Sequence, residues 1–107
     1  MAEATRHGKK RMKDRMGLNA KASDRQADLA LERGMRHGDT VGRLHKWISG
    51  CAYISGGNGG KYIVYNNQLF IFNSLYEKVI TVLDIPSYLL DVAAAQMKKF
   101  KKAKAVQ

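Results

Sequence analysis

The sequence has one proline, one cysteine and one tryptophan, and no apolar run approaches the ~20 residues needed to span a bilayer. The lone Cys51 excludes an internal disulfide, and no spacing of Cys and His resembles a zinc site. The basic N-terminus is not followed by the apolar segment of a secretory signal. We therefore expect a cytoplasmic protein that holds no metal or cofactor and does not bind a membrane.

Negative charge is also scarce, because 9 Asp and Glu residues stand against 19 Lys and Arg, for a net charge of +10. The net charge is +6 over residues 1–46, −1 over residues 47–91 and +5 over residues 92–107. Basic blocks of this kind attract phosphate backbones by releasing counterions, whereas a merely solvated surface is the alternative. We expect a polyanionic partner, with nucleic acid as the leading candidate.

The length of 107 residues predicts one domain over residues 1–107, and the hydrophobic fraction of 45% is that of an ordinary globular chain. Residues 5–33 are predicted to form a helical hairpin, because Lys, Arg, Met and Ala dominate there. Thr5 is suited to the N-cap of the first helix and Gly17 to its C-terminus. The second helix is expected to begin after Asn19 or Ser23.

Residues 46–85 are predicted to form a four-stranded antiparallel sheet, which makes the fold class α+β. The first strand is placed at residues 46–55, with a bend at Gly50. Two further strands flank a tight turn at Asn66 and Asn67, and the last precedes Pro86. Residues 86–103 are predicted to form a C-terminal helix that becomes purely basic after its middle.

The hairpin turn predicts the register, because a two-residue loop pairs Tyr65 with Gln68. One face of the sheet is then apolar and is expected to form the core, with Tyr62, Val64, Leu69, Ile71, Ile80 and Val82. The opposite face mixes aromatic, polar and basic groups, namely Lys61, Ile63, Tyr65, Gln68, Phe70, Phe72, Val79 and Thr81. This second face could be covered by the C-terminal helix, could join two subunits in a homodimer, or could be a surface on which bases stack.

Two motifs resemble a group of small bacterial and phage proteins related to the RelE/ParE-type toxins. The first helix contains His-x-x-x-Arg-Met-x-x-Arg, from His7 to Arg15, and the last strand reads Ile-Thr-Val followed by a proline. The resemblance covers roughly residues 5–86. It implies a helical hairpin packed on a curved four-stranded sheet, whose concave face carries residues that cleave RNA.

The resemblance also implies a catalytic set for metal-independent RNA cleavage, made of His7, Arg11, Arg15 and Thr81. His7 would act as base or acid, and the two arginines would bind phosphate, because this reaction needs proton transfer and a cation beside the developing charge. The last strand departs from many RNA-cleaving relatives, since it offers only Thr81 and Asp84 as polar side chains.

Two functions remain open at this point. The leading one is a basic protein that binds nucleic acid, RNA rather than DNA, and that could be an endoribonuclease. The alternative is a non-catalytic inhibitor from a phage or mobile element, which blocks a host defence complex by occupying a nucleic-acid site or an acidic protein surface. The expected nucleic-acid-binding residues are Arg6, Lys9, Lys10, Lys13, Lys61, Tyr65, Phe70, Lys98, Lys99, Lys101 and Lys102.

Overall fold

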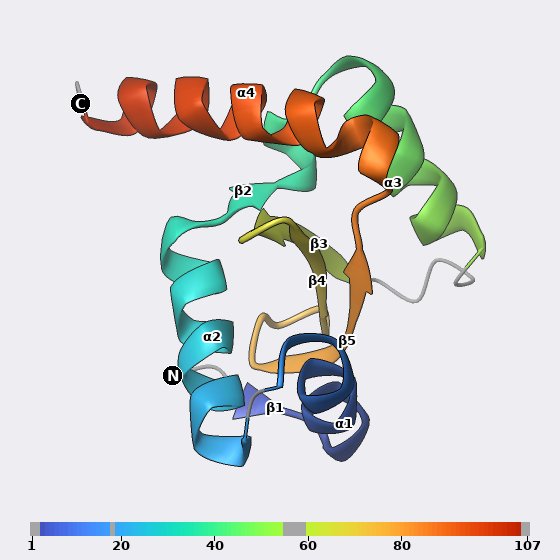
Figure 1. Cartoon of the computed structure of the whole chain (residues 1–107), viewed down its shortest axis with the longest axis vertical. Coiled ribbons are helices and arrows are strands. Elements are labelled where there is room, and N and C mark those ends of the chain that lie inside the picture. Colours follow the sequence, from blue (N-terminus) through green and yellow to red (C-terminus); the bar gives the residue numbers. More distant parts are fainter. Residues whose placement is uncertain (1–2, 18, 55–59, 106–107) are drawn as a thin grey trace.

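The computed structural model describes residues 3–17, 19–54 and 60–105. Within these ranges a sheet lies between two pairs of helices (Figure 1), so the predicted α+β class is confirmed. The elements are β1 (Glu3–Ala4), α1 (Arg6–Met16), α2 (Ala20–Arg33), β2 (Met35–Arg36), a 3₁₀ turn η1 (His37–Asp39), α3 (Gly42–Ile54), β3 (Lys61–Tyr65), β4 (Gln68–Phe72), β5 (Lys78–Asp84) and α4 (Ser87–Ala105).

The helical hairpin of α1 and α2 begins and ends where the capping residues predict. The Thr5 hydroxyl accepts a hydrogen bond from the Gly8 N–H at 3.0 Å, and the Asn19 side chain accepts one from the Ala22 N–H at 2.8 Å. Gly17 closes α1 in the left-handed region, with φ of 67°. Local hydrogen bonds therefore define both helices before any packing is considered.

The β3–β4 hairpin has the predicted turn and register. Asn66 and Asn67 form the turn with φ of 51° and 62°, the left-handed values that a tight hairpin requires. Tyr65 pairs with Gln68, and the pairing continues to Lys61 and Phe72 without interruption. The predicted C-terminal helix is also confirmed as α4. Among the helices that the structure describes, none combines the length and the hydrophobicity of a membrane span.

A β-bulge in β5 changes which of its residues face the first two helices. Phe72 pairs with Val79, but Ile71 pairs with Thr81, so Ile80 is the extra residue. Val82 consequently lies on the face of Phe70, and Ile80 is 42% exposed. The prediction that Ile80 and Val82 share a face with Val64 is therefore wrong, because it assumed an unbroken alternation.

The strand predicted at residues 46–55 is also wrong, because Gly42–Ile54 form the helix α3. Leu44 and Ile48 are fully buried, and Trp47 and Cys51 pack against the same core, which is the spacing of a helical stripe. Gly50 lies on the exposed side of this helix. Its aromatic and β-branched content favoured a strand, but the periodicity of the buried residues decides the structure.

Both faces of the sheet are covered by helices, and the second face is covered by α1 and α2, which was none of the three alternatives that the sequence left open. On one side Ile63, Phe70 and Phe72 pack with residues of α1 and α2 such as Met12 and Ala27, all fully buried. On the other side the sheet packs against α3 and α4 through Tyr62, Val64, Leu69, Ile71, Leu44, Ile48, Leu89 and Ala93. Neither base stacking nor a homodimer can use a face that α1 and α2 already occupy.

The sheet includes two short strands that the sequence did not predict. The order among the described strands is β1-β5-β4-β3-β2. β1 runs parallel to β5, with Ala4 beside Val79, whereas β2 is antiparallel to β3, with Arg36 beside Ile63. The four antiparallel strands β2 to β5 match the predicted number, but β2 replaces the strand expected at residues 46–55.

Candidate functional site

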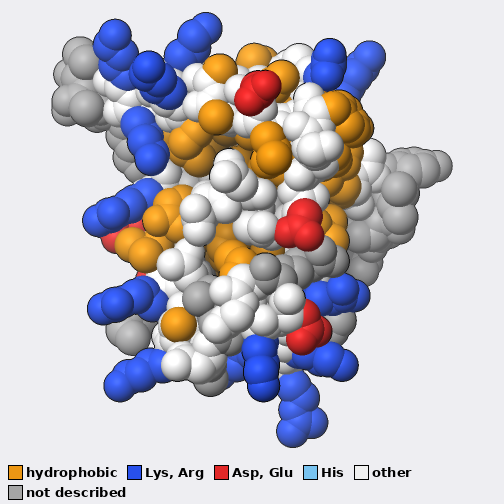
Figure 2. All heavy atoms as spheres, viewed as in Figure 1, with side chains coloured by type: hydrophobic (Ala, Val, Ile, Leu, Met, Phe, Trp, Pro, Cys, Tyr) orange, Lys and Arg blue, Asp and Glu red, His pale blue; other side chains and the backbone are white. Residues whose placement is uncertain are grey.

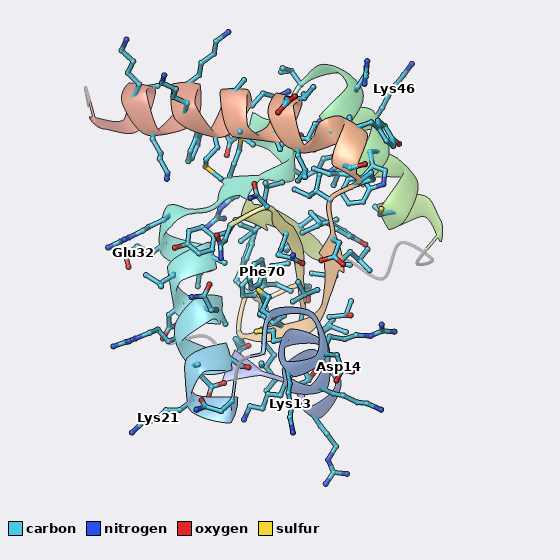
Figure 3. All side chains as sticks on the ribbon, in the orientation of Figure 1. Lys13, Asp14, Lys21, Glu32, Lys46 and Phe70 are labelled. Carbon is cyan, nitrogen blue, oxygen red and sulfur yellow. The ribbon has the colours of Figure 1, made fainter. Side chains whose placement is uncertain are left out.

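The first basic surface lies on α1. Arg6, Lys10 and Lys13 are exposed, and Figure 3 shows Lys13 pointing away from the body of the protein. Lys9 is half-buried and its ammonium lies 3.9 Å from a carboxylate oxygen of Asp24 on α2. The stripe of the helix with Gly8, Met12 and Met16 packs on the sheet. α1 therefore presents three exposed cations to solvent.

The second basic surface lies on the last turns of α4, where Lys98, Lys99, Lys101 and Lys102 are all exposed. Phe100 packs against the core on the other side of the helix. Asp91, near the start of α4, is the only acidic residue of this helix in the sequence, and none follows it, so the last turns of α4 carry positive charge alone. Figure 2 shows Lys and Arg side chains along the C-terminal part of α4 and around α1, with others along α2 and on α3.

A hollow of about 350 Å³ lies beside this second surface, between α4 and the β3–β4 turn. Ala93 and Met97 form an apolar part of its wall, and Lys98 and Lys101 line it from α4. The turn contributes polar side chains from Asn66 and Asn67. Two cations, two amides and an apolar wall therefore meet in one groove.

Of the catalytic set implied by the toxin resemblance, Thr81 lies on one face of the sheet and Arg11 belongs to a helix that covers the other face. Thr81 pairs with Ile71, so its side chain lies on the face covered by α3 and α4. α1 packs on the other face, where Arg11 is half-buried on that helix. The side chains of His7 and Arg15 lie outside the part of the chain that the structure describes.

The two aromatic residues that were expected to stack on bases pack inside the protein or against its core. Phe70 is fully buried, and Figure 3 shows it inside the molecule, so the prediction that it contacts nucleic acid is wrong. Tyr65 is half-buried against it, with ring centroids 6.3 Å apart. Lys61 is exposed, but it begins β3 whereas Tyr65 ends it, about 13 Å away at the usual rise of a strand.

The sequence analysis missed a histidine pair that joins η1 to α3. The rings of His37 and His45 are stacked with centroids 4.4 Å apart. His37 Nε2 lies 2.9 Å from the Ser49 hydroxyl, and His45 Nδ1 lies 3.1 Å from the Thr40 hydroxyl. His45 and Ser49 are four residues apart, which places them on the same face of a helix. Because residues 46–55 were predicted to form a strand, the sequence did not bring these two side chains together.

The hydroxyl groups indicate where each histidine holds its proton. The Ser49 hydroxyl donates to the carbonyl oxygen of His45 and the Thr40 hydroxyl donates to that of His37, so each must accept from an imidazole. Neutral His37 then carries its proton on Nε2, and neutral His45 carries its proton on Nδ1. Each ring keeps one nitrogen lone pair.

Burial and the adjacent His45 lower the pKa of His37, although a backbone hydrogen bond at His45 opposes the change. The neutral ring is therefore favoured at neutral pH. Burial also raises the pKa of the half-buried Cys51 thiol, in keeping with an unreactive side chain. Among the described residues, no group of His, Cys, Asp or Glu could hold a metal ion.

Comparisons with known proteins do not assign this chain to a family. No protein-family model, curated protein or solved structure matches it. The features of the molecule that bear on its function are therefore the two basic surfaces, the groove beside α4 and the residues around His37.

Proposed function

We propose that this protein binds nucleic acid, and RNA in preference to DNA, through the groove between α4 and the β3–β4 turn. The observation that carries the proposal is the position of Lys98 and Lys101 beside Asn66 and Asn67 in that groove. Lysines attract the phosphate backbone, and amide side chains can hydrogen-bond to base edges. The preference for RNA comes from the resemblance to the RelE/ParE-type toxins.

The remaining lysines of α4 extend the contact along a strand. Lys99 and Lys102 are exposed on the same turns, and the apolar wall at Met97 can contact a sugar or base. α1 adds a second basic surface at the other end of the molecule, through Arg6, Lys10 and Lys13. The protein is proposed to bind without cleavage, because Thr81 lies on the face of the sheet opposite α1.

Fluorescence anisotropy with a labelled single-stranded RNA tests this proposal over a range of salt concentrations. Affinity should fall steeply with salt, and replacing Lys98 and Lys101 by glutamine should reduce the slope by about 1.4, at about 0.7 for each phosphate contact. Arg43→Gln with Lys46→Gln is the matched control, because it removes two exposed charges from α3 and should leave the slope nearly unchanged. The RNA should remain intact throughout.

Three other results would redirect the proposal. Equal binding of a DNA strand of the same sequence would remove the preference for RNA. Binding that is lost equally in the control variant would show that total charge matters and the groove does not. If no nucleic acid binds even at low salt, an acidic protein surface becomes the better partner, and the non-catalytic inhibitor becomes the better function.

A further inference from the structure

A second hollow, of about 240 Å³, lies at the end of the sheet where β2 stops and β3 starts. Arg36 and Tyr76 line it from the side of the sheet that carries α1 and α2, and His37 lines it from η1. Lys61 lines it from the start of β3. This hollow is separate from the groove beside α4, with which it shares no residue.

The register places two like charges next to each other. Arg36 pairs with Ile63, and Lys61 is two residues before Ile63 on the same strand, so Arg36 and Lys61 are diagonal neighbours on one face. Diagonal neighbours lie about 7–8 Å apart, within reach of long side chains. Two cations at this spacing repel each other unless an anion lies between them.

The protein does not provide that anion within the part of the chain that the structure describes. Asp39 is near in sequence, but its carboxylate accepts a hydrogen bond from the backbone N–H of Arg36 and forms no ion pair with the guanidinium. Lys61 likewise forms no ion pair with a described residue. Residues 55–59, which precede the site, contain no Asp or Glu in the sequence.

Tyr76 holds the Arg36 side chain in position. The guanidinium carbon lies over the tyrosine ring, 4.4 Å from its centroid, in a cation–π contact. Tyr76 adopts a positive φ of 57°, which is unfavourable for a residue with a Cβ. Asn73 stabilises this turn, because its side-chain oxygen accepts hydrogen bonds from the N–H groups of Glu77 and Lys78 at 2.8 and 2.9 Å.

The wall of the hollow leaves room for a ligand to reach the backbone. Gly38 and Gly60 both line it, and no atom lies within 4 Å of the position that a Cβ of Gly38 would occupy. A glycine without such neighbours lets a ligand approach its main chain closely. His37 adds an imidazole that its contact with Ser49 holds at the same hollow.

We propose that this hollow is a phosphoryl-binding site, in which Arg36 and Lys61 contact a phosphate group beside His37. The planar guanidinium suits two oxygens of a phosphate, and the ammonium of Lys61 neutralises the remaining charge. The phosphate could be a monoester, as in a nucleotide, or a diester in an RNA backbone. The proposal does not require that α4 bind nucleic acid.

Titrating the isotope-labelled full chain with inorganic phosphate and with 5′-AMP tests the site by NMR. Chemical shifts of Arg36, His37, Gly38, Lys61 and Tyr76 should change together and saturate. Arg36→Ala and Lys61→Ala should each weaken binding at least about tenfold, the effect of losing a charged hydrogen bond. Arg36→Lys should weaken it less than Arg36→Ala, because it keeps the charge and loses the fork.

Lys46→Ala is the matched control, because Lys46 is an exposed lysine on α3 that does not line the hollow. The spectrum of each variant shows directly whether the variant is folded. If Arg36→Ala does not fold, Arg36→Lys tests the role of Arg36 in its place. Sodium chloride at equal ionic strength should leave these resonances unchanged. Phosphate binding that is equal in wild type, Arg36→Lys and Lys61→Ala, or absent in wild type, would overturn the proposal.

A second titration separates the two sources of phosphate. An RNA oligonucleotide with hydroxyl groups at both ends contains only diesters, so shifts at Arg36 and Lys61 would identify a backbone phosphate as the ligand. Shifts with 5′-AMP alone would identify a phosphate monoester. The Lys98→Gln, Lys101→Gln variant should still bind inorganic phosphate, so that failure at the α4 groove and failure at this site can be told apart.

Discussion

The two helical layers of this protein cover opposite faces of one sheet in different ways. α1 and α2 approach it closely through small residues, because Gly8 packs against β5 and Ala27 is fully buried. α3 and α4 approach it through longer side chains such as Leu44 and Leu89. α4 also runs beyond the sheet, since its 19 residues span about 28 Å (Figure 1). The first layer is thus built for close packing, and the second leaves surface free for binding.

Substitution of a glycine in each layer should therefore have effects of opposite sign. A Cβ at Gly8 would clash with the carbonyl oxygen of Val79, a backbone atom that cannot easily move, so Gly8→Ala should lower the free energy of unfolding by about 1–3 kcal/mol. A Cβ at Gly50 on α3 would meet nothing within 4 Å, so Gly50→Ala should raise it by about 0.5–1 kcal/mol. Urea denaturation measures both values. Two changes of the same sign would refute the contrast in packing.

The capping of the first layer offers a smaller test. The Asn19 side chain accepts a hydrogen bond from the Ala22 N–H at the start of α2, and Asn19→Ala removes it. The expected loss is about 1 kcal/mol of the free energy of unfolding, measured in urea. Asn19→Asp is the control, because a carboxylate can cap the same N–H groups and should restore most of the stability. An alanine variant as stable as the wild type would show that packing alone fixes the start of α2.

The smallest expected effect is a dependence of the free energy of unfolding on pH, which comes from His37 beside α3. The pKa of His37 is lowered in the folded protein from the usual 6.5, so the unfolded chain binds more protons as the pH falls through that value. Stability should therefore decrease as the pH falls through 6.5, and the decrease should level off below the folded pKa. His37→Gln should flatten the profile. His45 stacks on this ring, and Arg36 and Lys61 line the same hollow, so an unchanged slope would mean that another group carries the titration.

The sequence predicted best where short local signals decide the structure. Thr5, Gly17 and Asn19 act through hydrogen bonds or backbone angles within a few residues, and they fix the ends of α1 and α2. The Asn66–Asn67 turn fixes the β3–β4 register in the same way. The bulge at Ile80 has no such local signal, because it arises from how β5 pairs with β4.

The functional surfaces were predictable only in part. The exposed lysines of α4 follow from a run of charge that no core could contain. The hollow at Arg36 and Lys61 is lined by residues that are 25 positions apart in sequence. Arg36 lies beside β3 only because β2 forms, and this two-residue strand has no sequence pattern that predicts it. Phe70 was misplaced because the sequence does not say that helices cover both faces of the sheet.

The parallel pairing of β1 with β5 determines the order in which this chain can fold. Thr5 donates its N–H to the carbonyl oxygen of Val79 and its hydroxyl to that of Ile80, which is 75 positions away in sequence. During synthesis α1 has no sheet to pack on until β5 has left the ribosome, and closing so long a loop is slow. The basic first helix is therefore the earliest to be made and among the last to dock, and it stays accessible to chaperones or polyanions for most of that time.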